Sequence, residues 1–264
     1  MDLELAERVV IVTGGSSGIG FAIARLFAAE GARVVITARR VDMLEAAARE
    51  ISEATRSEVL ALPSDTTDQG QVDRVVAEVL RQYARIDILV NCAAAPSGLV
   101  RNAIEELDSD ALLKDLNTKV VGYARYARAV VPAMKERRWG RIISIGGLTG
   151  RDSSLLSGMR NVAICHLTKT LSDQLGPQGI TVNVVHPGLI RTPHLTELFE
   201  KEATKWRTTS AAIEAGYVAR TPTRRIVEAE EIANTVAFLA SAHGASINGE
   251  SLAVDGGITR GIFL

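Results

Sequence analysis

The feature that most constrains this chain is the repeated alternation of short, apolar, largely β-branched runs with amphipathic stretches of helical period. Seven runs predict strands, at residues 8–12, 34–36, 59–62, 86–90, 141–145, 180–185 and 252–254. Six stretches predict helices, at residues 21–30, 42–51, 72–80, 109–135, 158–175 and 228–240. Near-continuous apolar strands that alternate with helices indicate a parallel sheet covered on both faces. We therefore expect an α/β fold, a Rossmann-like doubly wound parallel sheet of seven strands.

Local signals set the expected ends of some helices. The pattern Asp42-x-x-Glu45 predicts a capping box that opens the second helix. Gly31 closes the first helix, and Gly176-Pro177 stops the helix that begins at Gly158.

The 264 residues contain no compositional linker, so we expect a single domain, 1–264. Residues 189–226 lie outside the alternation: they are rich in charge and Thr, include Trp206 and Tyr217, and contain no predicted strand. A segment of that size is more typical of a functional loop than of a linker, and we interpret it as a helical substrate lid.

Composition excludes several classes of partner. The 30 Lys and Arg residues nearly balance 31 Asp and Glu, for a net charge of −1. This balance argues against electrostatic binding of nucleic acid or an anionic membrane over a broad surface. Only two cysteines occur, Cys92 and Cys165, so a disulfide framework is excluded and a reducing compartment is favoured. The pattern of the first residues predicts no signal peptide, and no apolar run reaches the roughly 18 residues of a membrane span. We expect a cytoplasmic protein that acts on a small molecule.

A glycine-rich segment, Thr13-Gly14-Gly15-Ser16-Ser17-Gly18-Ile19-Gly20, joins the first predicted strand to the first predicted helix. Glycines allow a tight turn and a close approach of a ligand to the backbone, and the helix N-terminus offers free N–H groups to a pyrophosphate. The alternative is a plain glycine-rich turn. The strand–turn–helix context favours a dinucleotide site.

The spacing of these glycines, G-x-x-x-G-x-G, is one of four landmarks of a known family. Asn91-Cys92-Ala93-Ala94 stands where that family has Asn-Asn-Ala-Gly, residues 187–192 match its Pro-Gly-x-x-x-Thr, and residues 254–257 match its terminal Asp-Gly-Gly. With these landmarks in order over most of its length, the chain resembles the short-chain dehydrogenase/reductases. The resemblance implies an NAD(P)(H)-binding oxidoreductase that acts on a carbonyl or alcohol. It also implies a homodimer or homotetramer in which the helices at 109–135 and 158–175 pair across a twofold axis.

Charge at the end of the second strand indicates the type of cofactor. An NAD-specific site places a carboxylate there to bind the ribose hydroxyls, whereas this chain has Thr37-Ala38-Arg39-Arg40. Arg39 can stack on adenine and pair with a 2′-phosphate, with help from Arg40. The alternative is that both are solvated charges. NADP(H) is favoured over NAD(H).

The resemblance extends the cofactor site beyond the glycines. Asp65 matches the family acid that binds adenine, and Thr192 matches the residue near the nicotinamide carboxamide. The expected cofactor-binding residues are Thr13, Gly14, Ser16, Ser17, Gly18, Ile19, Gly20, Arg39, Arg40, Asp65, Thr66, Cys92, Ala93, Ala94, Pro187, Gly188, Ile190 and Thr192.

The family reaction uses four side chains, Asn, Ser, Tyr and Lys. The tyrosine protonates the substrate oxygen, and the lysine lowers the pKa of the tyrosine and binds the ribose of the cofactor. The serine binds the substrate oxygen, and the asparagine anchors a water relay. Asn117 matches the asparagine. Alignment from the flanking motifs places Gly147 at the serine, Ser157 at the tyrosine and Asn161 at the lysine. The resemblance therefore implies a divergent member that lacks the Ser-Tyr-Lys residues.

A serine hydroxyl is a far weaker acid than a phenol, so another group would have to supply the proton. Loss of a positioned acid costs about 10²–10⁴ in rate. Helical spacing places Arg160 and Asn161 on the side of Ser157, and Arg160 is a good clamp for an oxyanion or carboxylate. The alternative for Arg160 is a solvated charge or a salt bridge between subunits. The expected catalytic set is Asn117, Ser157, Arg160 and Asn161.

Other side chains near this site carry weaker indications. Hydroxyls of Thr149, Ser153 and Ser154 are candidates to bind a substrate oxygen, and His194 is a candidate acid. His166 falls on the opposite side of the helix from Ser157 and is interpreted as structural. Neither cysteine has metal-ligand spacing or a nearby base, so packing roles are favoured and no metal is expected.

Three functions remain open from the residues alone. The first is an NADP(H)-dependent oxidoreductase with a different proton-transfer arrangement. Its candidate substrates include 3-oxoacyl-like compounds, because the predicted lid carries apolar residues such as Leu195 and Phe199. The second is a non-redox lyase or isomerase on the same fold. The third is a catalytically silent nucleotide-binding regulatory subunit. The first is favoured because the lid and the carboxamide contact would otherwise have no role.

Overall fold

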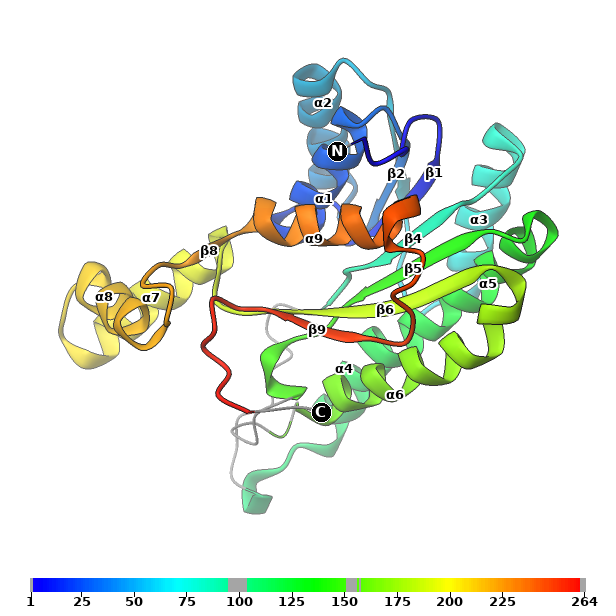
Figure 1. Cartoon of the computed structure of the whole chain (residues 1–264). Coiled ribbons are helices and arrows are strands. Elements are labelled where there is room, and N and C mark those ends of the chain that lie inside the picture. Colours follow the sequence, from blue (N-terminus) through cyan, green and yellow to red (C-terminus); the bar gives the residue numbers. More distant parts are fainter. Residues whose placement is uncertain (1, 95–103, 151–155, 157, 262–264) are drawn as a thin grey trace.

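The computed structural model describes residues 2–94, 104–150, 156 and 158–261. Its core is a sheet of seven parallel strands in the order β3-β2-β1-β4-β5-β6-β9 (Figure 1). The strands are β1 Val9–Thr13, β2 Arg33–Ala38, β3 Val59–Pro63, β4 Ile88–Asn91, β5 Gly140–Ile145, β6 Ile180–Pro187 and β9 Ser251–Val254. This confirms the predicted doubly wound α/β fold. The strand order reverses between β1 and β4, which is where ligands bind in such sheets.

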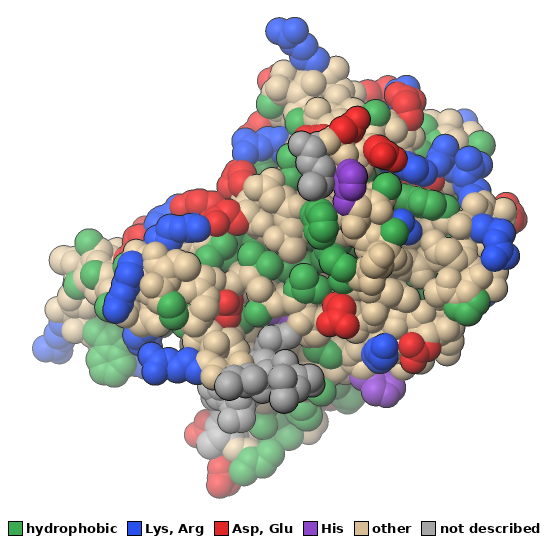
Figure 2. Space-filling model, viewed as in Figure 1, with side chains coloured by type: hydrophobic (Ala, Val, Ile, Leu, Met, Phe, Trp, Pro, Cys, Tyr) green, Lys and Arg blue, Asp and Glu red, His purple; other side chains and the backbone are tan. Residues whose placement is uncertain are grey.

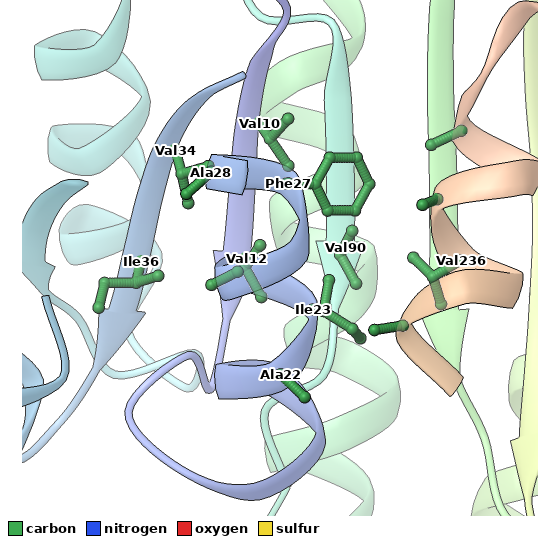
Figure 3. Close-up of a cluster of buried hydrophobic side chains, with 14 of the residues drawn as sticks. Val10, Val12, Ala22, Ile23, Phe27, Ala28, Val34, Ile36, Val90 and Val236 are labelled. Atoms are coloured by element: carbon green, nitrogen blue, oxygen red, sulfur yellow. The ribbon is translucent and has the colours of Figure 1, made fainter. Parts of the chain in front are cut away.

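Helices cover both faces of the sheet. They are α1 Gly18–Ala29, α2 Val41–Thr55, α3 Gln69–Tyr83, α4 Ser109–Leu116, α5 Gly122–Arg137, α6 Gly158–Leu175 and α9 Ala229–Ala240. Alternate residues of β1 serve the two layers: Val10 and Val12 pack with α1, α2 and α9, as part of the cluster in Figure 3, whereas Val9 and Ile11 pack with α3 and α5. The sheet is therefore buried on both faces, which is why its strands are apolar throughout.

The predicted helix over 109–135 is interrupted. Between α4 and α5 the chain forms a π-helical turn, Asn117–Val121, in which each hydrogen bond spans one residue more than in an α-helix. The extra residue changes which side chains face the sheet, and this turn contributes to the site described below.

Residues 189–226 form two helices, α7 Pro193–Trp206 and α8 Ser210–Arg220, which extend away from the sheet in Figure 1. The stacked rings of Phe199 and Tyr217, with centroids 5.4 Å apart, join the two helices. The prediction that this segment contains no strand was wrong, because Ile190–Arg191 (β7) pairs with Val227–Glu228 (β8). Strands of two residues are too short to produce a periodic pattern in sequence.

The predicted capping box at Asp42 was also wrong. Helix α2 begins at Val41 with Arg40 as its N-cap, and that cap makes no side-chain hydrogen bond. The connection from β2 is so short that Asp42 already lies in the first turn, where a carboxylate interacts favourably with the helix dipole. A capping box occurs at α9 instead, between Glu228 and Glu231.

Acidic and basic side chains are interspersed over the face of the molecule shown in Figure 2, and no single sign covers it. Within the described residues, none of the helices combines the length and apolar character needed to cross a bilayer.

Candidate cofactor and catalytic site

The glycine-rich loop between β1 and α1 requires its glycines. Gly14 and Gly18 have positive φ angles of 71° and 56°. A Cβ at Gly14 would lie 2.9 Å from Ala93 Cα, and one at Gly20 would lie 2.3 Å from the carbonyl oxygen of Gly14. Ser17, the N-cap of α1, makes no side-chain capping bond, and the first turn of this helix contains no acidic residue. The loop thus presents backbone N–H groups and the positive end of a helix to an anion.

A cleft of about 940 Å³ runs along the carboxyl edge of the sheet, within the size range of nucleotide and small-molecule sites. Most of the residues predicted to bind cofactor line this cleft. They are Gly14, Ser16, Ser17, Gly18, Ile19, Gly20, Arg39, Arg40, Thr66, Cys92, Ala93, Ala94, Pro187, Gly188, Ile190 and Thr192.

Two predicted cofactor residues do not line the cleft. Thr13 is buried, and its Oγ1 accepts hydrogen bonds from the backbone N–H groups of Cys92 (3.0 Å) and Ala93 (3.1 Å). Asp65 accepts hydrogen bonds from the N–H (2.9 Å) and hydroxyl (2.8 Å) of Thr67. Thr13 therefore fixes the loop after β4 against the glycine-rich loop, and Asp65 fixes the loop after β3.

The cleft is cationic. Its described lining includes Arg39, Arg40, Lys119 and Arg160 but no Asp or Glu. Arg39 and Arg40 are exposed at the end of β2, and neither forms an ion pair within the described part of the chain. Such a lining suits a ligand that carries several negative charges, and the glycine cradle supplies the close approach that a pyrophosphate requires. The residues present therefore fit a phosphorylated dinucleotide.

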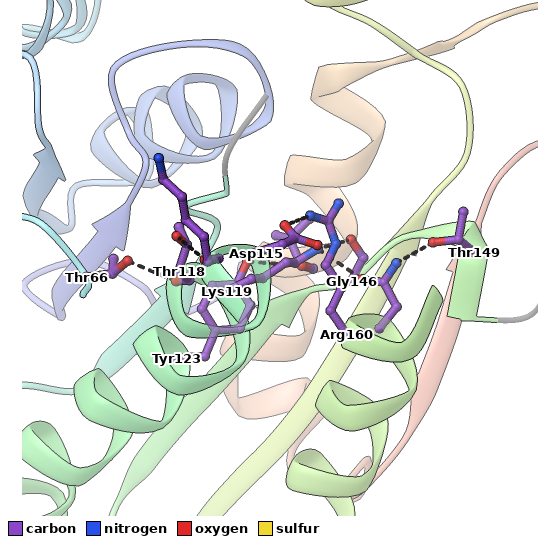
Figure 4. A network of polar contacts seen from close by, with 11 residues as sticks. Thr66, Asp115, Thr118, Lys119, Tyr123, Gly146, Thr149 and Arg160 are labelled. Atoms are coloured by element: carbon purple, nitrogen blue, oxygen red, sulfur yellow. Dashed lines mark hydrogen bonds and ion pairs between the residues drawn. The ribbon is translucent and has the colours of Figure 1, made fainter. Parts of the chain in front are cut away.

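At the opposite end of the cleft, three elements bring polar side chains together (Figure 4). Lys119, from the π-helical turn, is only 3% exposed, and its Nζ donates to the carbonyl oxygen of Gly146 (2.7 Å) and to Asn161 Oδ1 (3.1 Å). Asn161, on α6, donates in turn from Nδ2 to Thr149 Oγ1 (2.7 Å). All four residues line the cleft, so the network borders the ligand space directly.

Burial, followed by the charge of the neighbouring Arg160 guanidinium, lowers the pKa of Lys119, which is about 7. Cys92, Asp115 and Cys165 act in the opposite direction but do not compensate. The ammonium of Lys119 consequently gains and loses its proton near neutral pH, which an exposed lysine does not do.

Arg160 forms a buried ion pair with Asp115 of α4. Burial raises the pKa of Asp115, and the charge of Arg160 counteracts this only in part. Arg160 is therefore not a solvated charge, and its ion pair with Asp115 lies within one chain. It lines the cleft with its guanidinium oriented by a carboxylate of the same chain.

Gly147 fits closely against Asn161. A Cβ at Gly147 would lie 2.9 Å from Asn161 Nδ2, closer than real Cβ contacts allow. Ser157 lies outside the described residues, as do Ser153 and Ser154. Asn117 lies in the π-helical turn but does not line the cleft; its Oδ1 accepts a hydrogen bond from Arg125 (3.0 Å).

The histidines and cysteines near the site differ in position. His194 is exposed at the start of α7 and lines the cleft. His166 is exposed on α6, on the side opposite the buried Arg160 and Asn161, as the helical spacing predicts. His186 is buried and accepts a hydrogen bond at Nδ1 from Gly147 N–H (3.0 Å). Its Nε2 lies 3.3 Å from Cys165 Sγ, so the prediction that this cysteine has no nearby base was wrong, because the two residues meet through tertiary packing.

Burial raises the pKa of the Cys92 thiol to about 12, so this cysteine is not a thiolate nucleophile near neutral pH. Within the described residues, no three His, Cys, Asp or Glu side chains are grouped so as to hold a metal ion.

Sequence reasoning missed Lys119 and Asp115. The available signal was a lysine two positions after Asn117, beside an apolar Val-Val pair. On an α-helix, residues two apart face different directions, so the pattern did not connect Lys119 with the site. In the structure, Lys119 lies in the π-helical turn and lines the cleft.

The doubly wound sheet, the glycine loop and the switch-point cleft define a dinucleotide-binding α/β protein. Residues 14–259 match the family model described as Enoyl-(Acyl carrier protein) reductase. The chain is 35% identical to the 3-oxoacyl-acyl-carrier-protein reductase FabG of Escherichia coli over 97% of its own length and 99% of that protein.

Solved structures of reductases share this fold. L-sorbose reductase of Gluconobacter frateurii, in complex with NADPH and L-sorbose, is 31% identical, with a TM-score of 0.93 and coverage of 99% of this chain and 100% of that one. An actinorhodin polyketide ketoreductase with NADPH is 31% identical, with a TM-score of 0.89 and coverage of 97% of this chain and 98% of that one. The chain belongs to the short-chain dehydrogenase/reductase family, whose members are NAD(P)-dependent oxidoreductases.

Proposed function

We propose that this protein is an NADP(H)-dependent reductase of a small-molecule ketone, with an active site that does not use the tyrosine and lysine of its family. The observation that carries this proposal is the cleft itself. It combines a complete glycine cradle with four cationic side chains and, among its described lining, no carboxylate.

The cofactor residues divide by position along the cleft. The glycine-rich loop and the N-terminus of α1 hold the pyrophosphate, and Arg39 and Arg40 hold the 2′-phosphate at the end of β2. Thr192, the N-cap of α7, also lines the cleft, and in this proposal it binds the carboxamide. When bound, the cofactor supplies the hydride.

The catalytic end departs from the family pattern at three positions, Gly147, Ser157 and Asn161. Two of these changes support one another sterically, because the amide of Asn161 occupies the space that a side chain at position 147 would need. Asn161 and Thr149 present polar atoms to the cleft, and Arg160, oriented by Asp115, places a positive charge beside it. In this proposal Arg160 stabilises negative charge on the substrate oxygen.

The proposed substrate is a ketone with an apolar or acyl-like substituent. Leu189, Leu195 and Leu198 provide an apolar wall to the cleft on the side of α7. The names of the relatives also support a carbonyl substrate, since one is a 3-oxoacyl-acyl-carrier-protein reductase and another is an L-sorbose reductase in complex with L-sorbose. In this proposal α7 and α8 serve as the substrate lid.

The test begins with binding. Titration by nicotinamide fluorescence is expected to show tighter binding of NADPH than of NADH, and Arg39→Asp is expected to reverse or abolish that preference. Absence of nucleotide binding would remove the cofactor assignment, and an unchanged preference in Arg39→Asp would count against the phosphate role of Arg39.

The second part of the test is turnover. We expect NADPH consumption with at least one compound from a panel of 3-oxoacyl thioesters, ketoses and cyclic ketones. Nucleotide binding without turnover of any ketone would favour a silent regulatory subunit. Conversion of a substrate with no change in nicotinamide absorbance would favour a lyase or isomerase.

We further propose that the protein assembles as a homodimer or homotetramer through the helical layer that contains α4, α5 and α6. Met159 and Val162 on α6 are 48% and 55% exposed, and Leu113 and Val121 are exposed on the neighbouring segment. Large apolar side chains on adjacent surfaces support an interface there.

A further inference from the structure

The hydrogen bonds of Lys119 divide the three protons of its ammonium into two kinds. Two fixed acceptors, the carbonyl oxygen of Gly146 and Asn161 Oδ1, take two N–H groups. Both bonds can persist in the neutral amine, which keeps two hydrogens. The third proton is the one that distinguishes the charged from the neutral form, and Lys119 lines the cleft.

We propose that Lys119 is the catalytic proton donor to the substrate oxygen, a role that rests on the reductase function proposed above. As the carbonyl carbon accepts the hydride supplied by the cofactor, the carbon–oxygen π pair becomes a lone pair on oxygen. An N–H bond of Lys119 Nζ then breaks and an O–H bond forms, which leaves an alcohol and a neutral amine. Solvent protonates the amine again before the next turnover.

The position of Lys119 in the cleft fits this role. Its acceptor Gly146 directly follows β5, whereas Arg39 follows β2, so β1 and β4 lie between the two ends. A dinucleotide whose 2′-phosphate lies at Arg39 and whose pyrophosphate lies at the loop after β1 extends toward β4 and β5. Its reactive ring therefore approaches the end of the cleft where Lys119 lies.

Burial and the surrounding charges together leave Lys119 able to release a proton near neutral pH. Arg160 on α6 favours the neutral amine, while Asp115 on α4, Cys92 after β4 and Cys165 on α6 favour the ammonium. With burial, the balance brings the pKa of Lys119 to about 7. A general acid is most effective when its pKa lies near the working pH.

Other donors at this end are less suitable. A guanidinium is a poor proton donor, so Arg160 suits stabilisation of charge rather than proton transfer. Tyr123 is buried, donates to the carbonyl oxygen of Ile145 (3.1 Å), and does not line the cleft. His194 is exposed at the start of α7, outside the network that fixes Lys119.

The first test measures binding rather than activity. Oxidised nicotinamide carries a positive charge that reduced nicotinamide lacks, so a protonated Lys119 beside it weakens NADP⁺ binding only. The ratio of the Kd values for NADP⁺ and NADPH is expected to fall several-fold between pH 6 and 8. Titration of the 2′-phosphate cancels in this ratio. Lys119→Met is expected to make the ratio independent of pH.

The second test measures turnover with the ketone found for the wild-type protein. Ketone reduction is expected to decline as pH rises through about 7, and alcohol oxidation is expected to increase over the same range. Lys119→Met is expected to lower kcat by about 10²–10⁴ while NADPH still binds. Lys119→Arg keeps a charge without a transferable proton, so it should not restore kcat.

Lys114→Met is the matched control, because Lys114 is exposed on the adjacent α4 and does not line the cleft. It is expected to leave both the ratio and kcat unchanged. If wild type reduces a ketone but Lys119→Met retains kcat and the pH dependence of the ratio, Lys119 is not the donor and the reductase function stands. If wild type binds NADPH and reduces no ketone, the proposed function fails and the role of Lys119 fails with it.

Discussion

Lys119 is unusual among lysines because its ammonium is almost fully enclosed by the protein. Burial of an ammonium disfavours the charged form, which is why the pKa of Lys119 falls to about 7 from about 10.4 in an unfolded chain. Between these values the unfolded chain binds more protons than the folded one. The free energy of unfolding therefore rises with pH across this window. Below about pH 7 both states are protonated and the full cost of the buried charge is present.

The rise of the unfolding free energy with pH leads to a stability prediction for Lys119→Met. Relative to wild type, Lys119→Met is expected to be most stable near pH 6, and its advantage should shrink by about 1–2 kcal/mol as the pH rises from 7 to 8.5. Urea unfolding at a series of pH values measures this difference. Lys114→Met should differ from wild type by a constant amount, and a constant difference for Lys119→Met would contradict the burial argument.

At the scale of elements, the loop after β5 and helix α6 fit together through one glycine and one asparagine. Gly147 has no side chain, and the Asn161 amide lies where one would be. This complementarity explains how α6 approaches the loop after β5 closely enough for Asn161 to reach both Lys119 and Thr149.

A double-mutant cycle tests this fit. Gly147→Ala alone is expected to cost about 1–3 kcal/mol of unfolding free energy through overpacking. Combined with Asn161→Ala, it should cost less than the sum of the two single changes, with a coupling of about 0.5–3 kcal/mol. Gly216→Ala, in the exposed part of α8 with no atom within 4 Å of its Cβ, is the control and should be neutral or slightly stabilising. Additive effects at 147 and 161 would contradict the fit.

The elements themselves could be predicted from sequence because each main strand has a continuous apolar run and each main helix a full apolar period. The cofactor loop could be predicted because glycine spacing at positions 14, 18 and 20 reports backbone geometry directly. The π-helical turn and the pairing of Ile190 with Val227 left no comparable pattern. Lys119 and Asp115 depend on that turn and on a contact between α4 and α6, and such tertiary effects are not encoded in local periodicity.

At the scale of the whole molecule, the exposed apolar side chains on α6 have no partner in the described chain that covers them. If copies of the chain pair through this layer, the mass in solution should be two or four times the 28.2 kDa of one chain. Val162→Glu is expected to lower it toward the monomer, as measured by light scattering after gel filtration. Lys201→Glu, on the distant α7, is the control. A monomeric wild type would contradict the proposed assembly.

Two charged regions of the cleft lie at different strands of the sheet. Arg39 follows β2, whereas the polar network around Lys119 lies at the end of β5. Groups so far apart share no contacts, so changes at one end are expected to leave the other nearly unaffected. Selection can therefore remodel the chemistry performed by such a protein without altering which coenzyme it recruits. The same separation makes the scaffold modular for engineering, since coenzyme choice and reactivity can be rewritten one at a time.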